Sequence, residues 1–367
     1  MSAQNLTLVN FRNYQNLEVE FSPAINIFFG ENAQGKTNII ESIFLNAVGK
    51  SHRGGNDTDL IKLDETAAKI KLNYTKLNIP NTNEFIISRE NRRRIIKNGK
   101  NTTVGNIIGS FNAVLFSPED LMLIKGAPAL RRKFLDREIS QANPAYYHEL
   151  CKFNRIVNQR NTLLKNIREK KADKDTLLPW DEQFAAGAAK IAAKRQAAVK
   201  KMAEFAAIAQ DVISDHHEKL VLNYEVYGNN DNNPLNEYFY LQQLQERLNT
   251  DIIRGTTGIG PQHDDLTAYI NGTVLKTYGS QGQQRTTVLS LKLAEMQFLY
   301  EETGEYPVLL LDDVMSELDS KRRESLAAFL REKKIQTIIT ATDKNFFAAW
   351  QDVFLWQVKN GTVHNMS

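Results

Sequence analysis

One segment near the start of the chain carries the clearest chemistry. Residues 30–37 read Gly-Glu-Asn-Ala-Gln-Gly-Lys-Thr. This is the spacing of a P-loop, in which backbone N–H groups and a helix N-terminus surround phosphate oxygens. Lys36 is expected to place its ammonium on the outer phosphates, and Thr37 to offer its hydroxyl to Mg²⁺. The residues that we expect to bind ATP here are Gly30, Glu31, Asn32, Ala33, Gln34, Gly35, Lys36 and Thr37.

A second segment, near the other end of the chain, supplies carboxylates. Residues 308–311 are apolar and are followed by Asp312 and Asp313. A carboxylate at the end of a buried strand is suited to hold the Mg²⁺ beside a P-loop, and we assign Asp312 this role. Asp313 is predicted to polarise the attacking water. The alternatives are a helix N-cap for Asp312, and a supporting metal contact or N-cap for Asp313. The predicted catalytic residues are therefore Asp313, Asp312 and Lys36.

A third polar segment, Ser280-Gln281-Gly282-Gln283-Gln284-Arg285, precedes an apolar-periodic helix. A serine and a glycine at a helix N-terminus favour an anion. The segment is a weak signal alone and gains specificity from its place about two dozen residues before the Asp312 strand. We expect Ser280, Gly282 and Gln283 to contact the nucleotide.

The elements around the P-loop have the order that the motif needs. Residues 5–9 and 17–21 alternate between apolar and polar side chains and are predicted to be paired strands. Residues 25–29 read as a buried strand, and the apolar residues of 39–48 recur at helical spacing up to Gly49, which is placed to end the helix.

The middle of the chain changes character twice. Residues 68–114 are predicted to form antiparallel strands, with Asn98-Gly99 as a hairpin turn. Residues 119–218 are predicted to be helical, with Pro128 and Pro144 at helix starts. The segment 229–234 is polar and predicted to be a loop. Strand character returns at 266–275, a helix is expected at 283–302, and buried parallel strands at 307–312 and 335–341 flank a helix at 320–333.

One long helix shows a repeat of seven residues. The apolar row consists of Phe184, Ile191, Ala198, Phe205 and Val212, with Ala188, Met202 and Ala209 as a second row. This spacing predicts a coiled-coil seam. The expected partner is the segment around Leu150, Val157 and Leu164, in an antiparallel hairpin within one chain; an intermolecular coil is the alternative.

Composition bounds the class of protein. The chain has 367 residues, is 42% hydrophobic and 24% charged, and carries a net charge of +3. This balance fits an ordinary globular protein and gives no global argument for nucleic acid. The single cysteine, Cys151, excludes an internal disulfide and fits a reducing cytosol. With no apolar run of membrane-spanning length and no signal-peptide pattern at the start, we expect a cytoplasmic protein without a membrane partner; a peripheral membrane role is the alternative.

The three nucleotide segments, in this order, resemble the ATP-binding-cassette heads of the SMC-like class. Ser280–Arg285 matches the position of the class's signature motif. Ser316-Glu317-Leu318-Asp319 is similar to its D-loop, and Asp343, after residues 338–342, matches the strand that carries its switch residue. The resemblance implies an α/β fold: an ABC-type P-loop ATPase head split in sequence, with an inserted, mainly helical lobe that contains a short antiparallel helical hairpin. The implied domains are 1–115 with 286–367 for the ATPase lobe, and 116–285 for the inserted lobe.

Further stretches resemble the RecF family in particular. They are residues 11–14 (Phe-Arg-Asn-Tyr), 49–53 (Gly-Lys-Ser-His-Arg), 116–121 (Phe-Ser-Pro-Glu-Asp-Leu), 126–136 and 260–266. The chain departs from the general pattern at three points. Asp313 stands where cassettes have glutamate, no switch histidine is present, and Pro118-Glu119-Asp120 occupies the place of the Q-loop glutamine. It departs from the RecF pattern at Gln262-His263, which replace His-Arg.

The family resemblance implies a function. It implies an ATP-dependent DNA-binding protein of recombinational repair and replication, which binds junctions of single- and double-stranded DNA and helps to load recombinase. It also implies slow, DNA-stimulated ATP hydrolysis, a homodimer that forms on ATP with Ser280 of one protomer facing the phosphates at Lys36 of the other, and partners of the RecR and RecO type. The alternative is an SMC-like chromosome-organising head, which the short insertion disfavours. A transporter subunit or a small-molecule kinase fits less well.

Several basic residues have open interpretations. Arg53 stands where SMC-like heads place an arginine that reaches the nucleotide, with a solvated loop arginine as the alternative. Arg12 lies beside the base or at an exposed strand end. The densest basic cluster lies on the predicted hairpin, and Arg92, Arg93 and Arg94 are its candidate DNA contacts. The alternative is a charged edge that prevents aggregation.

Overall fold

The computed structural model describes residues 1–229, 234–316, 318–348 and 350–366. The chain forms two compact units, Met1–Asp120 with Lys292–Ser367, and Leu121–Leu291. The first unit contains β1 Ser2–Phe11, β2 Tyr14–Glu20, β3 Ile25–Phe29, α1 Lys36–Val48, β4 Ala67–Lys76, β5 Ile79–Ser88, β6 Arg94–Lys97, β7 Lys100–Thr102, α2 Val104–Ile107, β8 Ala113–Phe116, β12 Val308–Asp312, α10 Ser320–Lys333, β13 Thr337–Ala341, β14 Val353–Lys359 and β15 Thr362–Asn365.

The second unit is mainly helical. It contains α3 Met122–Lys125, α4 Pro128–Ala142, α5 Pro144–Arg168, α6 Leu178–Ile213, β9 Leu220–Glu225, α7 Glu237–Arg254, β10 Asp265–Ile270, β11 Thr273–Val274 and α8 Leu275–Tyr278. The boundary between the units falls within α9, Gln281–Thr303. No helix among the described residues combines the length and the apolar character needed to cross a membrane.

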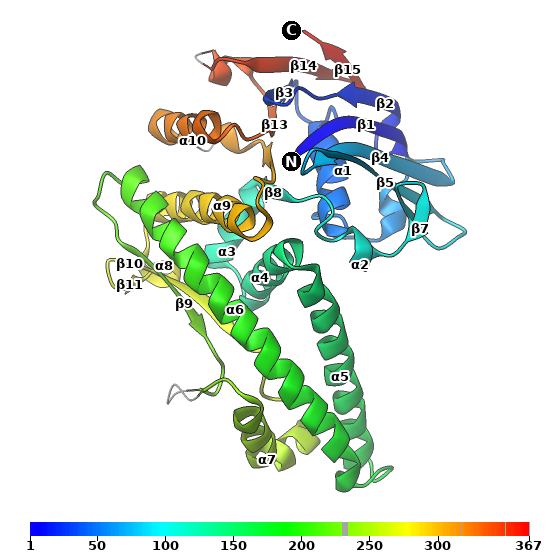
Figure 1. The fold of residues 1–367 in the computed structure, drawn as a ribbon, viewed down its shortest axis with the longest axis vertical. Helices are drawn as coiled ribbons and strands as arrows, with labels where there is room; N and C mark the ends of the chain where they lie inside the picture. The colour runs from blue at the N-terminus through cyan, green and yellow to red at the C-terminus, as the bar shows by residue number, and fades with distance from the viewer. Residues whose placement is uncertain (230–233, 317, 349, 367) are drawn as a thin grey trace. The chain divides into compact units, whose positions relative to one another are not determined.

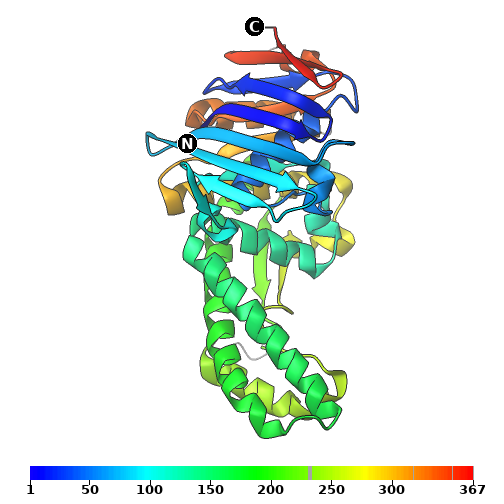
Figure 2. The same ribbon diagram turned by 90° about the vertical axis from the view of Figure 1, so that its right-hand side faces the viewer.

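Two sheets form the first unit. One has the strand order β15-β14-β3-β13-β12-β8, in which all neighbours pair in parallel except β14 with β15. The other has the order β2-β1-β4-β5-β6-β7, and its pairs are antiparallel. Figure 2 shows its first strands side by side, in blue to cyan. Parallel pairing places the ends of β3, β12 and β13 at one edge, where a phosphate site is expected.

Helix α1 lies between these two sheets. It contacts β8, β12 and β13 of the parallel sheet and β4 of the antiparallel one. Its buried residues therefore surround the helix, including Ile39, Ile40, Ile43 and Phe44. A helix buried on both faces carries apolar side chains all round. Gly49 ends it at φ 73°, with its N–H donating to Leu45 O, as the sequence predicted.

In the second unit, α5 and α6 form the predicted antiparallel hairpin within one chain (Figure 1). Phe153 packs on Phe184 with ring centroids 5.2 Å apart. A Cβ on Gly187 would approach the Phe153 ring to 2.9 Å, so glycine is required for this contact. Pro128 and Pro144 begin α4 and α5, as predicted.

The predicted seven-residue seam is wrong at its C-terminal end. Val212 is 59% exposed and Phe205 only half-buried, while Ala206, Gln210 and Ile213 are buried instead. A straight helix of 3.6 residues per turn drifts away from a seven-residue repeat. Over 36 residues this drift moves the buried stripe by one position.

Other strand predictions were correct in type but incomplete in context. Asn98-Gly99 does join β6 to β7, with φ values of 48° and 78°. The stretch predicted as antiparallel up to residue 114 is wrong at its end, because 104–107 is helical and β8 pairs in parallel with β12. Strand β9, helix α7 and the β14–β15 pair were not predicted. Each of them packs or pairs with an element that is distant in sequence.

Candidate nucleotide site

The P-loop joins β3 to α1, as predicted. Gly30 lies against β14: a Cβ there would come within 2.3 Å of Val358 O, so no other residue fits. Lys36 Nζ donates to the carbonyl oxygens of Gly30 and Glu31, at 2.6 and 2.7 Å. Burial lowers the pKa of Lys36, and the nearby carboxylates of Asp313 and Asp312 oppose this effect. The ammonium is thus held within the loop that it is expected to serve.

Asp312 and Thr37 meet although 275 residues separate them. The Thr37 hydroxyl donates to Asp312 Oδ1 at 3.0 Å, and the Thr340 hydroxyl donates to the same oxygen at 2.6 Å. These bonds join α1, β12 and β13, so the Asp312 carboxylate acts across three elements. A hydroxyl beside one carboxylate, with room for phosphate and water oxygens, is a donor set that suits Mg²⁺. The residues present therefore fit the predicted metal.

Asp313 occupies a strained position directly after β12. Its φ is 52°, and its N–H donates to Thr340 O at 3.2 Å and to Thr340 Oγ1 at 3.0 Å. Burial and the neighbouring Asp312 raise the pKa of Asp313, while Lys36 opposes the increase. Left-handed backbone at a non-glycine residue is costly and recurs at functional sites.

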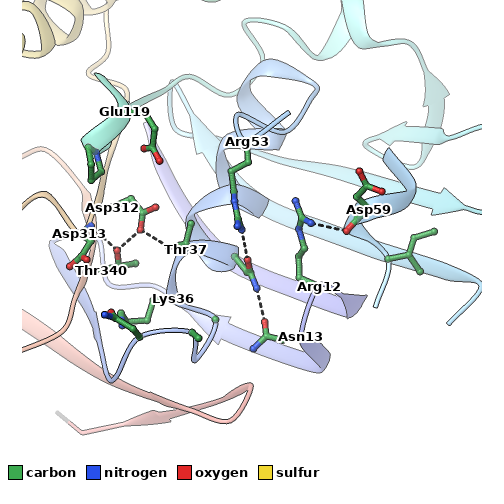
Figure 3. Close-up of a pocket in the computed structure, with 16 residues that line it drawn as sticks. Arg12, Asn13, Lys36, Thr37, Arg53, Asp59, Glu119, Asp312, Asp313 and Thr340 are labelled. Carbon is green, nitrogen blue, oxygen red and sulfur yellow. Dashed lines mark hydrogen bonds between the residues drawn. The ribbon is translucent and has the colours of Figure 1, made fainter. Parts of the chain in front are cut away.

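These residues surround a pocket of about 710 Å³. Its lining includes Asn32, Ala33, Gly35, Lys36 and Thr37 of the P-loop, together with Arg53, Glu119, Asp312, Asp313 and Thr340. Figure 3 shows Asp312, Asp313 and Thr340 gathered at one end, and Arg12 with Asp59 at the other. Gly30, Glu31 and Gln34 do not line the pocket and contribute through hydrogen bonds. Gly30 and Glu31 hold Lys36 by their carbonyls, and Gln34 O accepts from Asn13 Nδ2 at 3.0 Å.

Arg53 and Arg12 both line the pocket. Arg53 Nη1 donates to Asn38 Oδ1 at 3.1 Å, and Arg12 Nη1 donates to Asp59 O at 2.8 Å. The Arg53 side chain is 48% exposed and the Arg12 side chain 21% exposed, but each is held by its hydrogen bond. For Arg53 this weighs against the loop-arginine alternative, and for Arg12 against the exposed strand end.

Ser280 belongs to the second unit and begins α9. Its hydroxyl accepts from the Gln283 N–H at 3.1 Å, and Gln283 Oε1 accepts from the Ser280 N–H at 2.9 Å. This reciprocal pair is a capping box. Ser280 and Gln283 therefore already have a structural role at the helix start, beside any contact with nucleotide. Gly282 lies in the first turn of the same helix.

The chain matches known proteins over nearly its full length. A family model described as RecF/RecN/SMC N terminal domain covers residues 2–364. The chain is 43% identical over 345 residues to the DNA replication and repair protein RecF of Listeria monocytogenes serotype 4b (strain CLIP80459), with 93% of each chain covered. The chain belongs to the RecF family. The protein of the same name from Bacillus pumilus (strain SAFR-032) is 39% identical over 99% of this chain and 100% of its own.

Solved structures agree with this assignment. The recombination mediator protein RecF-ATP in the RecFOR pathway superimposes with a TM-score of 0.91 at 34% identity, over 100% of this chain and 97% of that one. An Smc head domain from Pyrococcus furiosus matches with a TM-score of 0.59 at 15% identity, over 100% of this chain and 96% of that one, and shares the fold alone. The predicted α/β cassette-type head is confirmed, and the RecF role in DNA replication and repair is favoured over the SMC alternative.

Two RecF-like motifs serve as structure in the second unit. Arg131 forms a two-pronged ion pair with Asp265, both bonds at 2.7 Å. Buried Arg195 binds Asp136 at 2.9 and 3.0 Å and donates to Pro261 O at 2.6 Å. The departure at Gln262-His263 is accommodated locally, since Gln262 Nε2 donates to Ile259 O at 2.6 Å.

The D-loop and switch segments make local hydrogen bonds. Ser316 Oγ donates to Asp313 O at 3.0 Å, and Asp319 caps α10 by accepting from the Arg322 N–H. Glu317 lies outside the described residues. Asp343 accepts from the Asn345 N–H at 2.8 Å, at the start of a short helix over 344–347.

The three candidate DNA contacts are not equivalent. Arg93 Nη1 donates to Gly49 O at 2.9 Å and pairs with Asp57 at 3.1 Å, and its guanidinium lies 5.7 Å from the Phe85 ring centroid. Arg93 therefore holds the end of α1. Arg92 and Arg94 are exposed. Phosphate contact stays a prediction for these two side chains, and is less suited to Arg93.

Sequence reasoning missed several residues of the site. Thr340 was assigned no role, yet its hydroxyl donates to Asp312. Asn13 was noted only within a family motif, yet it joins the P-loop to Asn38 by accepting from Asn38 Nδ2 at 2.7 Å. Glu41 was not considered. Its position four residues after Thr37, as the one acidic residue of α1 and directly after Ile39 and Ile40, was the available signal.

Proposed function

We propose that this RecF-family protein binds ATP with Mg²⁺ in the pocket of Figure 3 and hydrolyses the ATP slowly, with stimulation by DNA. The observation that carries the proposal is the meeting of Thr37, Asp312 and Thr340 beside the P-loop lysine, with bonds of 3.0 and 2.6 Å. The RecF-ATP structure, at 34% identity over the whole chain, supports the choice of nucleotide.

We infer the roles of the site residues from their positions. Lys36 and the P-loop N–H groups bind the phosphates, and Thr37 and Asp312 would hold the metal, which would neutralise phosphate charge. Asp313, one methylene shorter than glutamate, orients the attacking water and accepts its proton. Its short side chain is consistent with slow turnover. Ser280, Gly282 and Gln283 complete the site from a partner protomer.

Two protomers are proposed to close on ATP, with Ser280 of one chain facing the phosphates at Lys36 of the other. Because Ser280 also caps α9, a large substitution would confuse the loss of the cap with the loss of the interface. Ser280→Asp avoids this problem: aspartate is a good N-cap but repels a phosphate. We expect this variant to bind ATP as a monomer and to fail to dimerise. Ser280→Asn, a neutral cap, is the matched control and should dimerise.

Sedimentation with and without ATP and gapped DNA tests the assembly directly. The expected result is a shift from monomer to dimer with ATP, and a further shift with DNA that has a single- to double-strand junction. A Ser280→Asp chain that still dimerises would show that Ser280 does not act on the partner's nucleotide.

The finer division of the chain is part of the proposal. An ATPase lobe of 1–115 with 286–367 and an inserted lobe of 116–285 is supported by the compact units, which divide at residues 120 and 291. We propose that DNA and partners of the RecR and RecO type bind this assembly in the cytoplasm, where it helps to load recombinase. Pull-down of such partners by the ATP-bound dimer, and not by Ser280→Asp, is the expected result.

A further inference from the structure

Glu41 is a buried acid close to the nucleotide pocket but not part of its lining. It lies in α1, four residues beyond Thr37, and its side chain has no exposed surface. A carboxylate in such a place is costly unless charged or hydrogen-bonding partners compensate it. The partners of Glu41 therefore indicate what it does.

Three side chains converge on the Glu41 carboxylate. Arg12 binds it with two prongs, Nε to Oε2 at 2.9 Å and Nη2 to Oε1 at 2.7 Å. The Ser51 hydroxyl donates to Oε1 at 2.5 Å, and Arg53 Nη1 lies 3.8 Å from Oε2. These partners come from the β1–β2 turn and from the loop after α1, so the Glu41 carboxylate is one of the points at which the two loops are joined.

Both arginines extend from this buried anchor to the nucleotide pocket. Each is held at a second point, Arg12 by Asp59 O and Arg53 by Asn38 Oδ1. Arg12 also has a φ of 53°, in the two-residue turn between Phe11 and Tyr14. Strained backbone of this kind persists where the surroundings fix it.

We propose that Glu41 is a positioning residue that fixes Arg12 and Arg53 at the pocket, so that their remaining N–H groups are already directed at a bound nucleotide. The proposal rests on the proposed nucleotide-binding function and adds a part to it. Without the carboxylate, two neighbouring guanidinium groups lose their shared partner and regain rotational freedom. Binding would then have to order two long side chains, which weakens it.

A double-mutant cycle on ATP affinity tests this coupling. Fluorescent ATP is titrated into the full chain as wild type, Glu41→Gln, Arg53→Ala and the double variant. Each single change is expected to weaken binding about tenfold. Adding Arg53→Ala to Glu41→Gln should weaken binding by clearly less than the roughly tenfold loss expected for Arg53→Ala alone, because Glu41→Gln has already released Arg53.

Steady-state kinetics add a readout that general destabilisation would not produce. Arg12 lies at the end of the pocket away from Asp312 and Asp313 (Figure 3). Glu41→Gln should therefore raise KM with little change in kcat, as expected for lost uniform binding. Ile70→Val, which trims a fully buried side chain of β4 outside the pocket, is the control for lost stability and should leave KM unchanged.

The outcomes separate the two levels of the proposal. Wild type that fails to bind ATP would overturn the proposed function itself. ATP binding with additive effects of the two substitutions, or with full affinity in Glu41→Gln, would overturn the role of Glu41 alone. Should Glu41→Gln not fold, Ser51→Ala keeps both ion pairs and removes one hydrogen bond to Glu41. We then expect about threefold weaker binding, and unchanged affinity would again contradict the proposal.

Discussion

The nucleotide pocket of the first unit and the polar core of the second unit use the same residue types for different ends. In the pocket, Lys36 and Asp312 are 6% exposed and face a cavity of about 710 Å³. In the second unit, Arg195 is 3% exposed and donates hydrogen bonds to Asp136, Tyr146 and Pro261. A buried charged side chain that adjoins a cavity is thus available for binding or catalysis. A buried charged side chain whose hydrogen bonds are all made to protein groups serves to stabilise the fold.

Two buried carboxylates sharpen the contrast. Burial alone would raise the pKa of Glu41, but hydrogen bonds from Arg12 and Ser51 and the charges of both arginines bring it below its ordinary value of 4.5. Burial raises the pKa of Asp264 above 3.8, despite hydrogen bonds from Tyr224 and the Tyr227 N–H. For Glu41, the hydrogen bonds and the arginine charges therefore outweigh the effect of burial on the pKa. For Asp264, burial has the larger effect on the pKa.

The largest expected effect is on catalysis. Asp312→Asn should lower ATP turnover by about 10²–10³-fold, because the metal loses its carboxylate, while the fold persists. Asp313→Asn should trap the ATP-bound dimer instead. Turnover assays and sedimentation measure the two effects, with Asp64→Asn, an exposed carboxylate outside the pocket, as control. Normal turnover in Asp313→Asn would place the base elsewhere.

The next effect is on stability, in the other unit. Arg195→Ala should destabilise the protein by about 3 kcal/mol, since it leaves Asp136 without its main partner. Lys194→Ala, the adjacent residue with a half-exposed pair to Glu149, should cost at most about 1 kcal/mol. Urea unfolding measures both. Similar losses for the two variants would show that the Arg195 network is not a structural core.

A smaller effect should appear as opposite pH dependences. The stability that Glu41 contributes is present above pH 4.5 and is lost as the pH falls through the folded-state pKa. Ionised Asp264 destabilises the folded state, so its unfavourable contribution to the free energy of folding grows as the pH rises above 3.8. The gap between wild type and Glu41→Gln should therefore close on acidification. The stability of Asp264→Asn relative to that of the wild type should increase as the pH rises. Unfolding midpoints measured between pH 3 and 7 test this contrast. If the midpoints of both variants ran parallel to that of the wild type across this range, the contrast would be wrong.

The smallest effect concerns DNA. Replacing Arg92 and Arg94 by alanine should reduce the slope of log affinity against log salt by about two, one counterion for each lost phosphate contact. Arg93→Ala is the matched control: it should lower stability through Gly49 and Asp57 and leave the salt slope unchanged. A slope that depends on Arg93 alone would reverse the assignment made from its contacts.

Local sequence determined the parts of this protein whose geometry is fixed by neighbouring residues. The P-loop, the strand 25–29 and the turn at Asn98-Gly99 each follow from a few adjacent side chains and the backbone angles that glycine allows. Resemblance then led from these motifs to the RecF family. The helical hairpin was also predictable, although the buried face of α6 was not, because small differences in helical period accumulate with length.

Only the tertiary structure decided which charged residues act together. Thr37 meets Asp312 across 275 residues, and Glu41 collects Arg12 and Arg53 from two separate loops. Arg93 was indistinguishable from Arg92 and Arg94 in sequence, yet it alone of the three reaches Gly49 and Asp57. The physical reason is that the cost of burying a polar group, and the partner that offsets it, depend on neighbours that folding brings from elsewhere in the chain.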